Sequence, residues 1–233
     1  MNSILDEYLK DANFVKRGSA YFRVHGGEVL QVIKIEKKRD GNTTLNIGLF
    51  SMYSKLLPQW FTSQGCIPRY SVNDLVAKQT KYSYIHTNQQ NPYIASIVEL
   101  MIHNGIPWLD SIDTQQNILA GFNLLEMNRF GKINWVDELK FAPFLACEDY
   151  CSAEKVITSI LEQHRYAQRM NKSAFSNPDA YFEYVNRMNK DDMHYLFLLE
   201  MVQQQNILQI RKYLEENYQN NTKCARFCWH GMS

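Results

Sequence analysis

Two pairs of cysteines have a spacing that could hold a metal ion. Three residues separate Cys147 from Cys151, three separate Cys224 from Cys228, and His230 follows the second pair. Zinc takes four thiolate or imidazole ligands in a tetrahedron, so two such pairs could bind one ion. Zinc sites more often have two intervening residues, and buried thiols that pack as small apolar side chains are the simpler explanation. We therefore expect no metal and no other cofactor.

Arg187 and His194 form a second candidate pair, with six residues between them. This spacing occurs in some helical RNA-cleaving domains, where the two side chains line one active site. The intervening segment, Asn189 to Asp192, is expected to break the helix. A solvated arginine and a half-buried histidine then explain the pair more simply than catalysis does.

Five polar residues on or beside the predicted strands form the candidate ligand-binding site. Arginine and lysine donate charge-assisted hydrogen bonds, so several of them on one sheet face could bind an anion or a peptide carboxylate. The alternative, which we prefer, is the solvated side of an antiparallel sheet. The five candidates are Arg23, Gln31, Lys37, Asn46 and Arg69.

A basic run beside Asp40 comprises Lys34, Lys37, Lys38 and Arg39. Lysines at a strand end discourage pairing between sheet edges, so a solvated strand end is the expected role. A phosphate-binding patch is the alternative.

The elements that must position these residues begin with a helix and continue as an antiparallel meander. Ser3 can cap a helix whose apolar residues recur at helical spacing from Ile4 to Leu9. Three segments rich in Val, Ile, Tyr, Thr and Phe then predict strands at Tyr21–Val24, Val29–Lys37 and Thr43–Phe50. Alternation in the third strand predicts one buried face and one wetter face.

The connections between the strands are too short for a parallel crossover. Gly26-Gly27 and Asp40-Gly41 suit tight hairpins, so the three strands must be antiparallel. Cys66–Tyr70 and Tyr82–His86 are weaker strand candidates, and Pro68 favours an edge position for the first.

From Pro92 onward the apolar spacing becomes helical. We expect a first helix that ends at Gly105 and Pro107, and a second that Asp113 caps. The remaining predicted helices are Trp135–Ala146, which Pro143 is expected to bend or shorten, one from Ser152, Pro178–Met188, and Asp191 to about Tyr218.

The sequence therefore predicts an α+β fold, in which an N-terminal helix and an antiparallel β-meander of three to five strands precede an α-helical C-terminal half. Residues 1–88 are expected to form the sheet domain and residues 89–233 a helical region packed on it. One continuous domain is the alternative.

Several short motifs in the first half of the chain resemble a bacterial family, the domain of unknown function 4304. Its members show an F-x-K-x-G segment, an F-x-R strand, a Q-x-I strand ending in Q-K-S and an N-x-G strand. The matching segments, including two from further along the chain, are Phe14–Gly18, Tyr21–Arg23, Leu30–Ile33, Glu36–Lys38, Leu45–Gly48, Cys66–Arg69 and Ile106–Leu109. Glu36 and Lys38 depart from the family's Gln and Ser. The resemblance implies a fold but no biochemical role.

Composition and charge argue against nucleic-acid binding, membrane insertion and secretion. The 233 residues are 45% hydrophobic and 21% charged, enough for a folded core, and the net charge of +1 makes nucleic acid an unlikely partner. The longest apolar stretch, Tyr195–Leu199, is too short to span a bilayer, so no membrane partner is expected. The N-terminus has no secretory signal pattern. Five cysteines suggest reduced thiols and hence the cytoplasm.

No nucleotide-binding loop, nucleophile elbow or zinc-protease motif occurs in the sequence. The chain is therefore interpreted as a non-enzymatic interaction module that binds another protein through a sheet face or a groove between sheet and helices. The family type suggests a toxin as one such partner. The alternative is a hydrolase or nucleic-acid-processing enzyme with a non-local active site. The sequence leaves the oligomeric state open.

Overall fold

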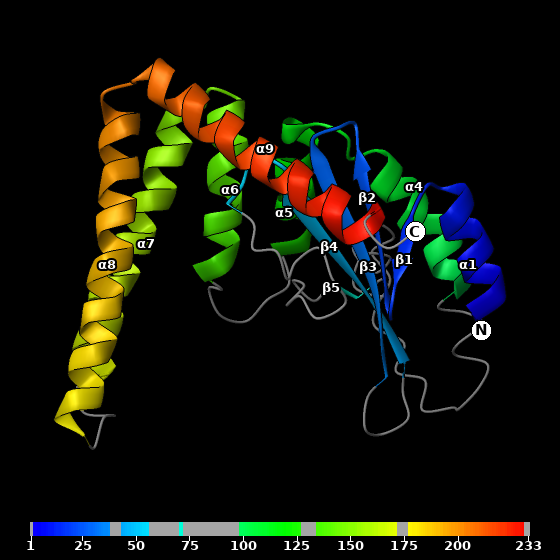
Figure 1. Ribbon diagram of the computed structural model, residues 1–233, viewed down its shortest axis with the longest axis horizontal. Coiled ribbons are helices and arrows are strands. Elements are labelled where there is room, and N and C mark those ends of the chain that lie inside the picture. Colours follow the sequence, from blue (N-terminus) through cyan, green and yellow to red (C-terminus); the bar gives the residue numbers. More distant parts are fainter. Residues whose placement is uncertain are drawn as a thin grey trace. The chain divides into compact units, whose positions relative to one another are not determined.

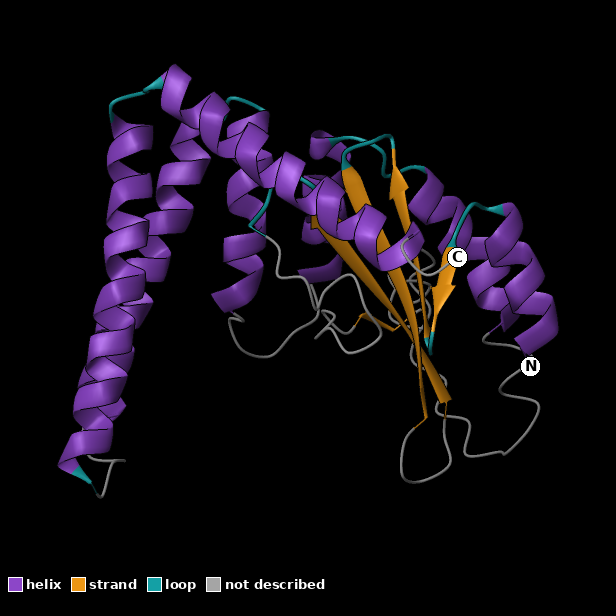
Figure 2. Cartoon of the chain, viewed as in Figure 1, coloured by secondary structure: helices purple, strands orange, loops and turns teal. Residues whose placement is uncertain are grey.

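The computed structural model describes residues 2–37, 43–55, 70–71, 98–126, 134–171 and 177–230. An N-terminal helix, an antiparallel sheet and a series of C-terminal helices follow one another along the chain, which confirms the predicted α+β fold (Figure 2). The chain divides into two compact units. Unit 1 comprises Met1–Arg129 together with Asn217–Ser233, and unit 2 comprises Phe130–Glu216.

Unit 1 is built on a sheet whose strands are ordered as they occur in the sequence (Figure 1). Every neighbouring pair is antiparallel, so the predicted meander is confirmed. Strand β1 precedes the first predicted strand and was not predicted. It has only three residues, too few to show the alternation of apolar and polar residues that is typical of a strand. The strands are β1 (Val15–Arg17), β2 (Ala20–His25), β3 (Val29–Lys37), β4 (Thr43–Ser51) and β5 (Tyr70–Ser71).

The turn between β2 and β3 depends on its two glycines. Gly26 and Gly27 have φ angles of +59° and +77°, in the region that side chains disfavour. A Cβ atom at Gly26 would also overlap the backbone oxygen of Asp113. The first hairpin is therefore fixed both by its local conformation and by the close approach of a later segment.

Both faces of the sheet are covered, so the expected wetter face is wrong. Every β4 residue from Leu45 to Ser51 is buried, including Asn46 and Gly48, whose side of the strand was expected to meet water. Helices α4 and α5 lie on one side of the sheet, and the C-terminal part of α9 lies on the other (Figure 1). Each side of a strand therefore faces packed protein, and polar residues in the sheet must find partners inside the chain.

The helices of unit 1 include a wide π turn, η2 (Met101–Gly105), that leads directly into α4 (Ile106–Asp110). The predicted helix end at Gly105 and Pro107 is therefore wrong. Pro107 cannot donate a backbone hydrogen bond and its ring crowds the preceding turn. The Ile106 amide instead donates to the backbone oxygen of Met101, five residues earlier in the sequence. Pro107 lies in the first turn of α4, where proline is tolerated.

Two further helices of unit 1 lie where the sequence predicts them. Helix α1 (Asn2–Asp11) buries Leu5 and Leu9. Helix α5 (Gln115–Glu126) begins one residue later than a cap at Asp113 implies, because the Thr114 hydroxyl accepts from the Asn117 amide.

Unit 2 is helical and buries its own apolar cluster. It contains α6 (Asn134–Ala146), α7 (Tyr150–Asn171), α8 (Pro178–Gln203) and the first part of α9 (Ile207–His230). Helix α6 includes Pro143, as predicted. The core residues come from all four helices and are Phe141, Leu145, Ala153, Val156, Ile157, Ile160, Leu161, Leu198, Met201, Val202 and Ile210.

Helix α8 runs unbroken through Asn189–Asp192, so the predicted break there is wrong. Contacts from α7 hold this segment. His164 Nδ1 lies 2.7 Å from Asp192 Oδ1, and Gln168 Nε2 donates to Asn189 Oδ1 at 3.3 Å. Tertiary hydrogen bonds of this kind outweigh the modest helix propensity of Asn and Asp, which is all that the sequence reveals.

The predicted strands at Cys66–Tyr70 and Tyr82–His86 lie outside the described residues, except for Tyr70 in β5. The expected domain boundary at residue 88 also lies outside them and stays a prediction. Helical residues 98–126 belong to the same compact unit as the sheet.

Candidate functional site

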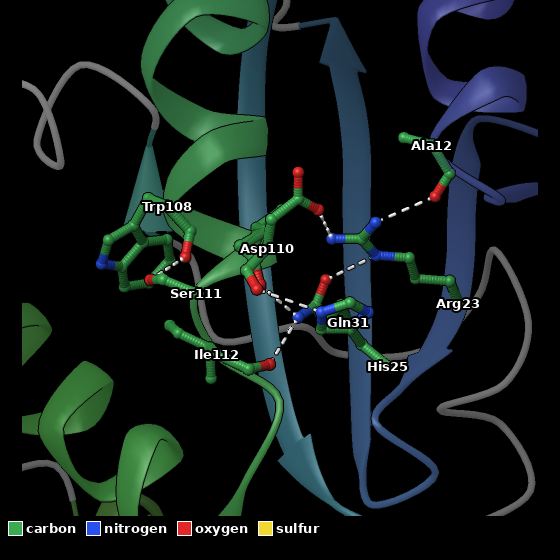
Figure 3. A network of polar contacts seen from close by, with 9 residues as sticks. Ala12, Arg23, His25, Gln31, Trp108, Asp110, Ser111 and Ile112 are labelled. Atoms are coloured by element: carbon green, nitrogen blue, oxygen red, sulfur yellow. Dashed lines mark hydrogen bonds and ion pairs between the residues drawn. The ribbon is translucent and has the colours of Figure 1, made fainter.

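The polar residues predicted as a ligand site include two that the structure brings together, Arg23 and Gln31. They occupy opposed positions on β2 and β3, so their side chains share one face of the sheet. Arg23 Nε donates to Gln31 Oε1 at 2.8 Å, and both residues are buried (Figure 3). The sequence named both residues among the five candidates, but it did not show that they pair or what surrounds them.

The guanidinium of Arg23 has a partner at each of its three nitrogens. Besides the bond to Gln31, Nη1 donates to the backbone oxygen of Ala12 at 2.9 Å, and Nη2 donates to Asp110 Oδ1 at 2.5 Å. The guanidinium also lies 4.4 Å from the centre of the Phe14 ring, within the range of a cation–π contact.

The side chain of Gln31 is equally engaged. Its amide nitrogen donates to the backbone oxygens of Leu109 and Ile112, at 2.7 and 2.8 Å. These oxygens lie at the end of α4 and in the turn that follows it. His25 contacts the same segment, with Nε2 3.0 Å from the backbone oxygen of Asp110 (Figure 3).

We call these contacts the Arg23 network: Arg23, Gln31 and Asp110 with the backbone oxygens of Ala12, Leu109 and Ile112. The network ties the end of α1 and the end of α4 to the middle of the sheet. A buried arginine is tolerated when paired and hydrogen-bonded, and here the partners come from within the chain. The hydrogen bonds of the network therefore stabilise the fold. Each of the three side-chain nitrogens of Arg23 already has a partner within the chain.

The other three predicted site residues do not join this network. Asn46 is buried on β4 opposite Lys34, on the other face of the sheet from Gln31. Lys37 ends β3 opposite Thr43, and nothing is described of its side chain. Arg69 lies outside the described residues. A site that gathers all five is therefore not seen, and a ligand-binding role for each stays a prediction.

A small charged cluster joins α1 to the edge of the sheet. Lys16 Nζ donates to Asp6 Oδ2 at 2.8 Å, and the Tyr21 hydroxyl also donates to this carboxylate. Partial burial raises the pKa of Asp6, but the hydrogen bonds from Lys16 and Tyr21 outweigh it and leave this pKa below its ordinary value. Burial, aided by the bond to Asp6, raises the pKa of Tyr21. The cluster is exposed at Lys16 and serves to attach the helix.

The cysteines do not assemble a metal site within the described part of the chain. Cys147, Cys151 and Cys224 are not disulfide-bonded, and no group of three or more potential ligands occurs among the described side chains. The side chains of Cys228 and His230 are not among them.

The structure places Arg187 and His194 on one continuous helix, which sequence reasoning did not anticipate. Seven residues span about two turns, so the two side chains project from the same side of α8. Arg187 is exposed and His194 is partly buried beside Tyr195, with ring centres 5.9 Å apart.

A feature that sequence reasoning missed lies on the outside of α8. Four large apolar side chains there are between 48% and 72% exposed, although the opposite side of the same helix is buried in the unit 2 core. A surface helix normally places polar residues on its outer side. We call this group the α8 outer face: Phe182, Met193, Leu196 and Phe197. The spacing of the last three could have signalled it, because Met193, Leu196 and Phe197 fall between the buried positions Met188 and Leu198.

No protein-family model, curated protein or solved structure matches the chain. The resemblance to domain of unknown function 4304 therefore stays a prediction. No helix in the described ranges is long and apolar enough to cross a membrane.

Proposed function

We propose that the chain is a non-enzymatic interaction protein that binds a protein partner through the α8 outer face. The supporting observation is the exposure of Phe182, Met193, Leu196 and Phe197 on a helix that is already well packed on its other side. Single exposed apolar residues are ordinary, but several along one helix face indicate an interaction site. Amphipathic helices commonly bind partners through such a row of anchors.

The Arg23 network supports the same proposal by contrast. Arg23 and Gln31, the buried polar residues of unit 1 that were predicted to bind a ligand, form hydrogen bonds within the chain instead. Within the described residues, this leaves the apolar surface of α8 as the strongest candidate for recognition. The resemblance alone suggests a toxin as one class of partner.

The test is native mass spectrometry on the protein purified gently from its own host. The wild type should carry the added mass of a protein partner. The double variant Met193→Ser, Phe197→Ser should lose that mass and keep the wild-type circular dichroism spectrum, because both side chains are more than half exposed. Tyr8→Ser is the matched control, since Tyr8 is an equally exposed aromatic residue on α1.

Two results would count against the proposal. One is a wild type that appears at the mass of a single chain in every preparation. The other is a partner that remains bound to the double variant as tightly as to the wild type.

RNA cleavage is the second candidate, favoured by the unbroken helix between Arg187 and His194. A histidine could transfer a proton while the arginine stabilises a phosphate. The test is incubation of the purified chain with single-stranded RNA. Cleavage that disappears in His194→Ala would support this candidate, and no cleavage by the wild type would exclude it.

A further inference from the structure

The exposed residues of α8 follow the spacing of a helix–helix seam. From Phe182 to Glu200, exposed positions recur at alternating intervals of four and three residues, close to the 3.5-residue repeat of paired helices. This interval keeps one side of a helix facing a partner helix. The seam positions are Phe182, Asn186, Asn189, Met193, Leu196 and Glu200, with Phe197 beside the last apolar one.

The apolar area of this seam is about three quarters of what a standard interface between two proteins buries. At about 200 Å² for each fully exposed large side chain, Met193, Leu196 and Phe197 together present roughly 340 Å². A standard interface buries about 800 Å² on each partner, of which about 57%, roughly 450 Å², is apolar. A second helix of the same kind would therefore cover the apolar segment from Met193 to Phe197, with Phe182 beyond the end of the partner's α8.

The charges along the seam indicate which helix fits. Lys190 and Glu200 are exposed and lie on either side of the apolar segment from Met193 to Phe197. In an antiparallel pair of α8 helices with its twofold axis between residues 194 and 195, Met193 of each copy lies opposite Leu196 of the other. Lys190 then lies within one residue of Glu200 on the other copy, at both ends of the contact. The seam is thus complementary to itself only in the antiparallel direction.

We propose that the partner of the α8 outer face is a second copy of this chain, paired antiparallel through α8. This inference rests on the proposed function, whose partner it names. Twofold dimers of identical chains are the commonest oligomers, and their interfaces must be complementary to themselves. The Asn189 side chain already accepts a hydrogen bond from Gln168 of α7. Asn186 is the other polar position in the seam, where a polar side chain fixes register at a cost in affinity, so we expect the dimer to dissociate in the micromolar range.

Charge reversal tests both the partner and the register. Lys190→Glu places two glutamates at each end of the contact, and Glu200→Lys places two lysines there. Each variant alone should dimerise about tenfold or more weakly than the wild type, because two attractive pairs become repulsive. An equimolar mixture should form a mixed dimer, since each end then pairs one glutamate with one lysine. The readout is native mass spectrometry of a heavy-isotope-labelled variant mixed with its unlabelled counterpart.

Analytical ultracentrifugation of the wild type from 1 to 100 μM supplies the reference. The wild type should pass from monomer to dimer over this range, and Tyr166→Ser, which alters an exposed aromatic residue on α7, should behave like it. A wild type that is monomeric at 100 μM would overturn the inference. So would charge variants that dimerise as the wild type does, or that fail to form a mixed dimer.

The two proposals fail in different ways. A monomeric purified chain whose α8 outer face still retains another protein in host preparations overturns the self-association and leaves the interaction function standing. A monomeric chain that retains no partner overturns both.

Discussion

The Arg23 network and the α8 outer face are opposite in every physical respect. The network centres on two polar side chains in the interior of unit 1, Arg23 and Gln31, which are hydrogen-bonded within the chain. The α8 outer face consists of apolar groups that remain in contact with solvent. Polar residues look functional in a sequence and apolar ones look structural. In this protein the roles are reversed, because burial and available partners determine what a side chain can do.

The largest expected effect comes from breaking the network. Arg23→Ala leaves the Gln31 oxygen, the Ala12 carbonyl and the Asp110 carboxylate without their donor. Loss of a buried paired charge should reduce the free energy of unfolding by about 3 kcal/mol. Urea titration followed by circular dichroism measures this loss, while association through α8 should persist at temperatures where the variant is folded. A variant of wild-type stability would show that Arg23 does not hold the fold.

Asn221 should show a smaller effect of the same kind. Its amide nitrogen donates to the backbone oxygens of Met52 and Ser54, each at 2.7 Å, within unit 1. Asn221→Ala leaves both oxygens without this donor and should cost about 2 kcal/mol of unfolding free energy. The exposed neighbour Asn220 provides the control, since Asn220→Ala should change the urea midpoint very little. Equal effects at the two positions would contradict the assignment.

Asp149 tests a charged group at the surface of unit 2. Hydrogen bonds from the Ser152 side chain and from the Ser152 amide, the latter at 3.0 Å, lower the pKa of this carboxyl at the start of α7. Because the folded-state pKa lies below the ordinary 3.8, the stabilisation is present above about pH 4 and is lost as the pH falls through the folded value. Asp149→Ala should cost about 1 kcal/mol at pH 7 and less at pH 3. Urea titrations at the two pH values measure the difference, and an equal cost at both would refute this explanation.

The α8 outer face should show the smallest effect on stability. Met193→Ser and Phe197→Ser alter side chains that are 72% and 51% exposed, so each should change the monomer's unfolding free energy by no more than about 0.5 kcal/mol. Leu198→Ser, the adjacent buried position, is the contrasting control and should destabilise strongly. Urea titration at a concentration well below 1 μM keeps association out of the measurement. A large loss at Met193 would mean that this residue packs inside the chain.

The fold was predictable wherever local sequence decides it. Gly26 and Gly27, followed by β-branched and aromatic segments, were sufficient for the meander, and Pro143 did not obscure α6. The predictions were wrong where contacts between distant parts of the sequence decide the structure. The second covered face of the sheet depends on residues after Asn217, more than 160 positions from β4. The continuity of α8 depends on His164 and Gln168 of another helix.

The candidate site was predictable only in part, for the same reason. Register placed Arg23 beside Gln31, but the donors and acceptors that complete the network come from Ala12 and from the end of α4. No sequence pattern near Arg23 predicts those hydrogen-bond partners. The exposure of Phe182 and Met193 likewise depends on which side of α8 the rest of unit 2 covers, which only the packing of α6, α7 and α9 determines.

The most direct test compares the wild type with the Met193→Ser, Phe197→Ser variant by native mass spectrometry, both purified gently from the host. The wild type should appear as an associated species, either a dimer or a complex with another protein, and the variant as a single chain of unchanged secondary structure. The same mass for both proteins would contradict the assignment of recognition to the α8 outer face.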